Sequence, residues 1–172
     1  MIVLPPKDNE IGAEVYVLLA ECRGPAYSKY KLDDATKCLQ LMDLVLYNRL
    51  KKPTDFGAKK GATLIDIIKA EGQFKHFEDY PKVNPNIEKN IQELLRVANN
   101  ETDKRKSEYQ AFINAAIEVA QSDSTIKDPS PGTLAYWRTE RSAEPSSKYY
   151  TVKLYKTLLH NDFYYILPKK TA

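Results

Sequence analysis

Apolar residues recur at helical spacing in the segment from Glu10 to Cys22. They stand at positions 11, 15, 18, 19 and 22, which is the pattern of one buried helix face. Asn9 occupies the expected N-cap, and Gly24-Pro25 follow as a stop signal. The pattern predicts an amphipathic helix that carries Glu14 and Glu21 on one face, because these acids are seven residues apart.

The same periodicity predicts four more helices. The second runs from about Asp33 to Leu50 and has a wide apolar side, so we expect it to be central; Pro53-Thr54-Asp55-Phe56-Gly57 ends it. Thr63 is placed to cap a short helix over 64–69. Two further helices are predicted from Asn84 or Asn86 to Ala98 and from about Asp103 to Gln121.

The pattern changes after residue 122. A turn cluster at 128–132 precedes three β-prone runs at 134–137, 149–155 and 163–167. Tyr136 and Trp137 are adjacent in the first run, so one of them should point into the core. We therefore predict an α+β protein, mainly helical, with a small C-terminal antiparallel β element and one domain over 1–172.

Composition narrows the function classes. The chain has 172 residues, a net charge of +3 with both signs interspersed, and no apolar run long enough to span a membrane. These features favour a globular protein and give no indication of nucleic-acid binding or membrane insertion. Cys22 and Cys38 fall on apolar helix faces and are expected to be buried, as free thiols or as a disulfide. His76 and His160 are far apart in the chain, and we expect no metal or other cofactor.

Glu21 is the first candidate for chemistry. It lies on the last turn of an otherwise apolar helix, where the negative end of the helix dipole and apolar neighbours disfavour the ionised carboxylate. A carboxylic acid that stays protonated near neutral pH is the proton donor that glycosidic cleavage requires. The alternative is an exposed helix-terminal glutamate without a chemical role.

The chain resembles the cell wall hydrolases related to the spore-cortex-lytic enzymes. The resemblance rests on ordered short motifs: Ala20-Glu21-Cys22-Arg23-Gly24, Val45-Leu46-Tyr47-Asn48-Arg49-Leu50, Gly72-Gln73-Phe74, Asp128-Pro129 with Gly132-Thr133-Leu134-Ala135-Tyr136-Trp137, and Phe163-Tyr164. It implies a lysozyme-like fold, with a helical insertion near 84–100. It also implies cleavage of the β-1,4 bond between N-acetylmuramic acid and N-acetylglucosamine in peptidoglycan, with Glu21 as general acid. Two departures are Pro25-Ala26, where the family often has a second acid, and the order His160-Asn161 before Phe163.

The reaction type and the partners of Glu21 stay open at this stage. Asp55, Glu78 and Asp79 are candidate second carboxylates, although each also fits a solvated loop acid. Hydrolysis uses two carboxylates at a defined separation. A single acid fits lytic transglycosylation better, in which Glu21 donates a proton and then accepts one from the muramyl 6-hydroxyl. We favour the latter.

Five residues are expected to contact the glycan beside Glu21. Gln73 and Phe74 would form the floor of a groove or, alternatively, anchor their loop. Tyr136 and Tyr164 could stack on sugars or belong to the core. Asn48 would contact substrate or, with Arg49, hydrogen bond at the end of its helix.

Export is the remaining question. The N-terminus, Met1 to Asp8, has no secretory signal pattern. We expect synthesis in the cytoplasm and action in the periplasm or cell wall, after delivery by a specialised route such as type VI secretion into a target cell. An immunity or inhibitor protein would then be a partner. The alternatives are a peptidoglycan-binding module without catalysis and an unrelated helical interaction protein.

Overall fold

The computed structural model of the chain describes residues 1–122, 126–139 and 142–170. Its elements are α1 (Glu10–Glu21), α2 (Leu32–Lys51), the 3-10 helix η1 (Pro53–Phe56), α3 (Leu64–Lys69), α4 (Pro85–Ala98), α5 (Lys106–Gln121), β1 (Thr133–Thr139), β2 (Tyr150–Leu158) and β3 (Asn161–Pro168). The fold class is α+β, as the periodicity predicts. Each predicted helix and strand is present, with ends that move by a few residues.

Helix α1 is enclosed by the rest of the helical body. The Asn9 side chain accepts a hydrogen bond from the Gly12 N–H at 2.8 Å and caps the helix. A Cβ atom on Gly12 would lie 1.8 Å from the Pro6 carbonyl oxygen, so the preceding segment crosses the helix at a distance that only glycine allows. Residues 12–19 are all buried. This burial explains why the helix is almost entirely apolar.

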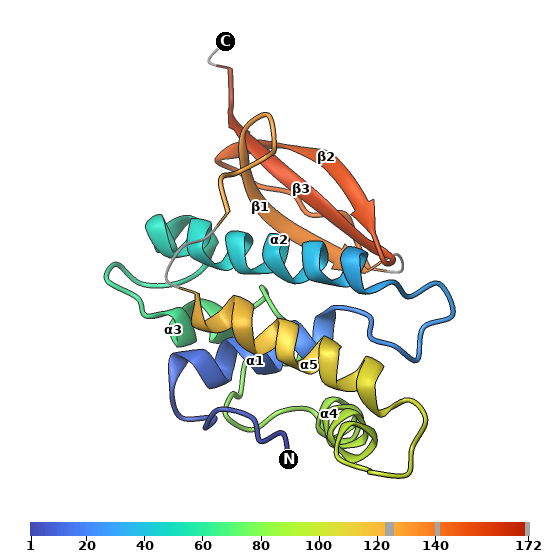
Figure 1. The fold of residues 1–172 in the computed structure, drawn as a ribbon. Coiled ribbons are helices and arrows are strands. Elements are labelled where there is room, and N and C mark those ends of the chain that lie inside the picture. Colours follow the sequence, from blue (N-terminus) through green and yellow to red (C-terminus); the bar gives the residue numbers. More distant parts are fainter. Residues whose placement is uncertain (123–125, 140–141, 171–172) are drawn as a thin grey trace.

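Helix α2 separates the sheet from the other helices (Figure 1). One side of α2 packs on β1, and its other sides pack on α5, α3 and α1. Helix α4 lies beyond α1 and α5, next to the N-terminus (Figure 1). The Ile2 backbone holds that end through two hydrogen bonds with the Asn99 side chain, at 2.7 and 3.0 Å. The central position of α2 agrees with its wide apolar side.

The sheet has the order β1-β3-β2 and is antiparallel throughout. Irregular register occurs next to Ala135 in β1 and next to Tyr155 in β2. Strands β2 and β3 are joined through Leu159 and His160, which both have positive φ, at 48° and 61°. This turn brings the start of β3 to the C-terminal end of α1, where Asn161 contacts Glu21.

Among the described residues, no helix is both long and apolar enough to cross a membrane.

Candidate functional site

Glu21 lies where the end of α1 meets the sheet. It is the last residue of the helix and is partly exposed, whereas the residue after it, Cys22, is buried in extended conformation. The Asn161 side-chain amide of β3 donates a hydrogen bond to the Glu21 carbonyl oxygen at 3.1 Å. One of the carbonyl groups that a helix end leaves unpaired is thereby satisfied by the sheet. The contact fixes the backbone of Glu21 against β3.

The Glu21 carboxyl group is held in a poorly solvated position. Burial raises its pKa from 4.5 to about 7, and a hydrogen bond from the Trp137 indole N–H opposes this rise. Among the described residues, no second carboxylate contributes to the shift. About half of the Glu21 side chains therefore carry a proton at neutral pH, and the group can donate or accept one there.

An aromatic platform supports Trp137. Its ring packs on that of Phe74, with centroids 5.0 Å apart and planes at 30°. Phe74 is buried, and the Arg49 guanidinium covers its ring at 4.7 Å from the centroid. Phe74 therefore packs against Trp137, the residue that hydrogen bonds to Glu21. Its role at the site is to support the Trp137 ring.

Arg49 ties the Gln73 loop to the sheet. The guanidinium donates to the Ala135 carbonyl at 2.8 Å and to Gln73 Oε1 at 3.2 Å. Its charge lies over the rings of Phe56, Phe74 and Tyr136 at 5.3, 4.7 and 5.0 Å. Because Arg49 is buried, its pKa falls to about 10. Gln73 is therefore held near the platform with its side-chain oxygen already occupied.

Tyr136 and Tyr164 lie on a different face from Trp137. They are direct partners across β1 and β3, whereas Trp137 pairs with Phe163. Successive strand residues point to opposite faces, so the two tyrosines point away from the Trp137 side of the sheet. Tyr136 packs on Phe56 at 5.8 Å, and Tyr164 is buried beneath Arg138 at 5.7 Å. The structure does not bring either ring to the Glu21 carboxyl group.

Asn48 makes hydrogen bonds within the chain. Its amide nitrogen donates to the Leu134 carbonyl at 2.8 Å and to Asp128 Oδ2 at 3.1 Å. The same Asp128 carboxylate accepts from the Leu134 N–H at 2.8 Å and from Ser130. Asn48 and Asp128 together fix the start of β1 on α2. Of the two roles considered for Asn48, these contacts match the one at the helix end.

The three candidate second acids lie away from Glu21. Asp55 accepts a hydrogen bond from the Tyr150 hydroxyl group on β2. Glu78 is exposed and accepts from the Gly72 N–H at 3.1 Å, and Asp79 is exposed on the same loop. None of the three contributes to the pKa shift of the Glu21 carboxyl.

A cavity of about 580 Å³ adjoins the C-terminal end of α1. Ala20 and Cys22 line it together with residues of α4 and Tyr109 of α5. Glu21 does not, because its side chain is turned toward Trp137. A second cavity of about 360 Å³ is lined by Asn48, Phe56 and residues of the sheet. Glu21 lines none of five cavities on the described surface.

Sequence reasoning placed Glu21 correctly at the helix end but did not single out Trp137, Arg49 and Asn161 as its supports. Trp137 is the only tryptophan in the chain, and a side chain with one polar atom on a large apolar ring usually finds a partner when buried. A lone tryptophan next to a predicted core position could therefore have indicated a hydrogen-bond partner such as Glu21. Asn161 gave no such signal, because its contact depends on the hairpin turn at Leu159 and His160.

Within the described ranges, no group of three or more His, Cys, Asp and Glu residues is arranged to hold a metal ion. Comparison with known proteins gave no match, whether with family models, with curated proteins or with solved structures.

Proposed function

We propose that this protein cleaves peptidoglycan glycan strands, with Glu21 as the general acid. The observation that carries the proposal is the state of the Glu21 carboxyl. It is desolvated enough to have a pKa of about 7 and has one hydrogen-bond donor, Trp137, while the residue as a whole remains partly exposed. Proton donors in glycosidases are tuned in the same way, by a poorly solvated position next to an aromatic ring. The motif resemblance and the proposed lysozyme-like arrangement point to the same residue.

The proton of Glu21 would go to the oxygen that links muramic acid to glucosamine. Protonation makes this oxygen a better leaving group, the C1–O bond breaks, and positive charge develops at C1 of the muramyl residue. The Trp137 indole N–H then stabilises the carboxylate that Glu21 becomes. Its hydrogen bond therefore strengthens as the proton leaves.

A one-acid mechanism accounts for the absence of a second carboxylate around Glu21 among the described residues. The 6-hydroxyl oxygen of the muramyl residue attacks C1, and its proton passes to the Glu21 carboxylate. One C–O bond breaks and one forms, no water is consumed, and the acid is regenerated. The product carries an anhydro end. We infer lytic transglycosylation in preference to hydrolysis on this basis.

We propose that Gln73 borders the glycan and that Phe74, Asn48, Tyr136 and Tyr164 act at a distance, through the positions of Trp137, β1 and β3. Action on the wall places the working protein in the periplasm or cell wall, with an immunity or inhibitor protein as the expected partner if it is delivered into a target cell. Delivery can be tested by expression with and without an added export signal. Equal toxicity in both forms would contradict a wall target.

A peptidoglycan-binding module without catalysis is the second candidate. It is favoured by one observation: Glu21 lines none of five cavities on the described surface. Such a protein would bind insoluble peptidoglycan and release nothing.

Mass spectrometry of purified peptidoglycan after incubation with the protein tests the proposal. We expect soluble muropeptides with anhydromuramic ends. Muropeptides with reducing ends would change the assignment from transglycosylase to hydrolase, and binding without any release would leave only the second candidate.

A further inference from the structure

The two cysteines of the chain lie together where the end of α1 meets α2. Both are free thiols in this structure, and both are buried, with exposed fractions of 3% for Cys22 and 0% for Cys38. The Cys22 thiol donates to the Ala35 carbonyl oxygen at 3.9 Å, and Ala35 precedes Cys38 by three residues on the same side of α2. This contact brings the Cys22 sulfur beside that of Cys38, to which it is hydrogen bonded.

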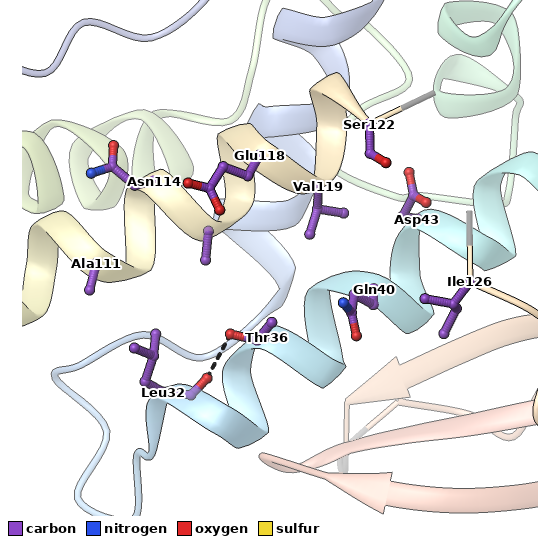
Figure 2. A pocket seen from close by; sticks show the side chains of 11 residues that line it. Leu32, Thr36, Gln40, Asp43, Ala111, Asn114, Glu118, Val119, Ser122 and Ile126 are labelled. Atoms are coloured by element: carbon purple, nitrogen blue, oxygen red, sulfur yellow. Dashed lines mark hydrogen bonds between the residues drawn. The ribbon is translucent and has the colours of Figure 1, made fainter. Parts of the chain in front are cut away.

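Cys38 lies on a different side of α2 from the cavity of about 460 Å³ that separates α2 from α5. Figure 2 shows Thr36, Gln40 and Asp43 on the side that borders this cavity. By helical spacing, positions 35 and 38 fall on another face of α2. Of the two cysteines it is Cys22 that borders a cavity, the one of about 580 Å³ at the end of α1. A thiol reagent from solvent therefore meets Cys22 first.

The cysteine pair is connected to Glu21 in two ways. Cys22 directly follows Glu21 in the chain, and its N–H donates to the Leu18 carbonyl at 3.0 Å, which closes the end of α1. The Asn161 amide nitrogen lies 3.1 Å from the Glu21 carbonyl oxygen and 3.8 Å from Cys38 Sγ. A bond between the two sulfurs would therefore fasten the residue after Glu21 to α2, next to the contact that already holds Glu21 against β3.

The Cys22 thiol does not ionise readily in the folded chain. Its hydrogen bond with Cys38 and its burial raise the pKa of Cys22 well above the ordinary value of 9. Because the thiolate is the species that attacks a disulfide, thiol–disulfide exchange is slow while the pair is buried. We therefore expect oxidation to take place as the chain folds, and the bond to be protected once the core has closed around it.

We propose that Cys22 and Cys38 are a redox-sensitive pair, a dithiol under reducing conditions and a disulfide in an oxidising compartment, and that the disulfide fixes the C-terminal end of α1 to α2. A small disulfide of the glutathione class serves as the oxidant. The Cys22 thiolate attacks one of its sulfurs and releases the first thiolate, and the Cys38 thiolate then attacks the Cys22 sulfur and releases the second. The pair loses two electrons and two protons in all, which the oxidant gains as it becomes two thiols.

The first test counts thiols in the full chain after refolding. The chain is unfolded in urea and refolded with either reduced or oxidised glutathione, then denatured, alkylated with N-ethylmaleimide and weighed by intact mass spectrometry. The reduced sample should take up one maleimide on each cysteine. The oxidised sample should be monomeric and take up none. Since Cys22 and Cys38 are the only cysteines in the chain, a monomer without free thiols or adducts has this one disulfide.

Amide hydrogen exchange tests whether the disulfide fixes the end of α1. Exchange of the Cys22 amide should be slower by roughly tenfold or more in the disulfide form, because the bridge suppresses local opening of the helix end. The Asn99 N–H, which closes α4 with a bond of 2.9 Å to the Leu95 carbonyl, is the matched control. Its exchange should be equal in the two forms. A double variant with Cys22→Ser and Cys38→Ser should show no dependence on the redox buffer.

The proposal is overturned if the oxidised chain keeps two free thiols, or if it forms dimers or glutathione adducts in place of the internal bond. It is also overturned if the Cys22 amide exchanges at the same rate in both forms. These measurements do not involve glycan cleavage, so loss of the proposed role of Glu21 would leave them unchanged.

Discussion

Helix α1 carries two desolvated glutamates that differ in what surrounds them. Glu14 is fully buried, faces the Asp43 carboxyl and has a pKa of about 10. Glu21, two turns later, is partly exposed, accepts from the Trp137 indole and has a pKa of about 7. Burial is the largest cause of the shift in both. The neighbour then sets the final value, since a second acid raises the pKa and a neutral donor lowers it.

The comparison teaches that a raised pKa alone does not identify a catalytic acid. Glu14 has the larger shift, but it has no access to a substrate and its proton is used inside the core. Glu21 combines a smaller shift with partial exposure of the residue and with a donor that stabilises its ionised form. Only the second combination allows a proton to leave and return near neutral pH.

The largest expected effect is a difference in glycan cleavage between substitutions of Glu21 and of Glu14. Glu21→Gln should reduce muropeptide release by about 100-fold or more, since the amide keeps the shape and removes the proton. Glu14→Gln is the matched control on the same helix and should retain activity. Both would be measured with purified peptidoglycan and folded proteins of equal circular dichroism. Wild-type rates from Glu21→Gln would contradict the assignment.

The next effect concerns how the free energy of unfolding depends on pH. The folded-state pKa of Glu14 lies above its unfolded value of 4.5, so the folded state binds more protons and loses stability as pH rises from about 4.5 toward 10. One proton gives a slope of at most about 1.4 kcal/mol per pH unit. Glu14→Gln should flatten this part of the curve and stabilise the protein above neutral pH. Urea unfolding at a series of pH values measures it. A curve unchanged by the substitution would show that Glu14 is not the group responsible.

A smaller effect tests the donor to Glu21. Trp137→Phe keeps an aromatic ring on Phe74 but removes the N–H that lowers the pKa of Glu21. The general acid is active when protonated, so activity should fall as pH rises through about 7, and this limb should move to higher pH in Trp137→Phe. The pH profile of glycan cleavage gives the shift. A limb that moves to lower pH would exclude the proposed hydrogen bond.

The smallest effect concerns the support from β3. Asn161→Ala leaves the Glu21 carbonyl without its donor and should cost about 1 kcal/mol of unfolding free energy. It should also change the pH profile, because Glu21 is no longer fixed against the sheet. Asn99→Ala removes two hydrogen bonds at the N-terminus and is the control for a loss of stability alone. Equal pH profiles of activity for the two variants would show that Asn161 does not position Glu21 for the reaction.

Local sequence signals predicted the elements well. Asn9 and Thr63 accept the capping hydrogen bonds that their positions indicate, and Asn84 does so before Pro85. The apolar side of α2 predicted its central place. These features depend on residues close together in the chain, which is why one sequence was sufficient to predict them.

The site itself depends on contacts between distant segments. Leu159 and His160 form the turn with two left-handed residues, and neither is Asn or Gly, so their residue types do not indicate a tight hairpin. The register of β1 and β3 shifts next to Ala135. Strand alternation in the sequence therefore could not predict which of Tyr136 and Trp137 faces the helices. The Glu14–Asp43 contact joins two helices and could not be read from the periodicity of either. Glu21 was predictable, but its environment was not.

The central claim is that Glu21 is a partly protonated acid at neutral pH. Carbon-detected NMR titration of glutamate side-chain carboxyl groups tests it without any substrate, and the resonance missing in Glu21→Gln identifies the group. We expect that resonance to titrate with a pKa of about 7, and higher in Trp137→Phe. A pKa near 4.5, the ordinary value for glutamate, would contradict the account.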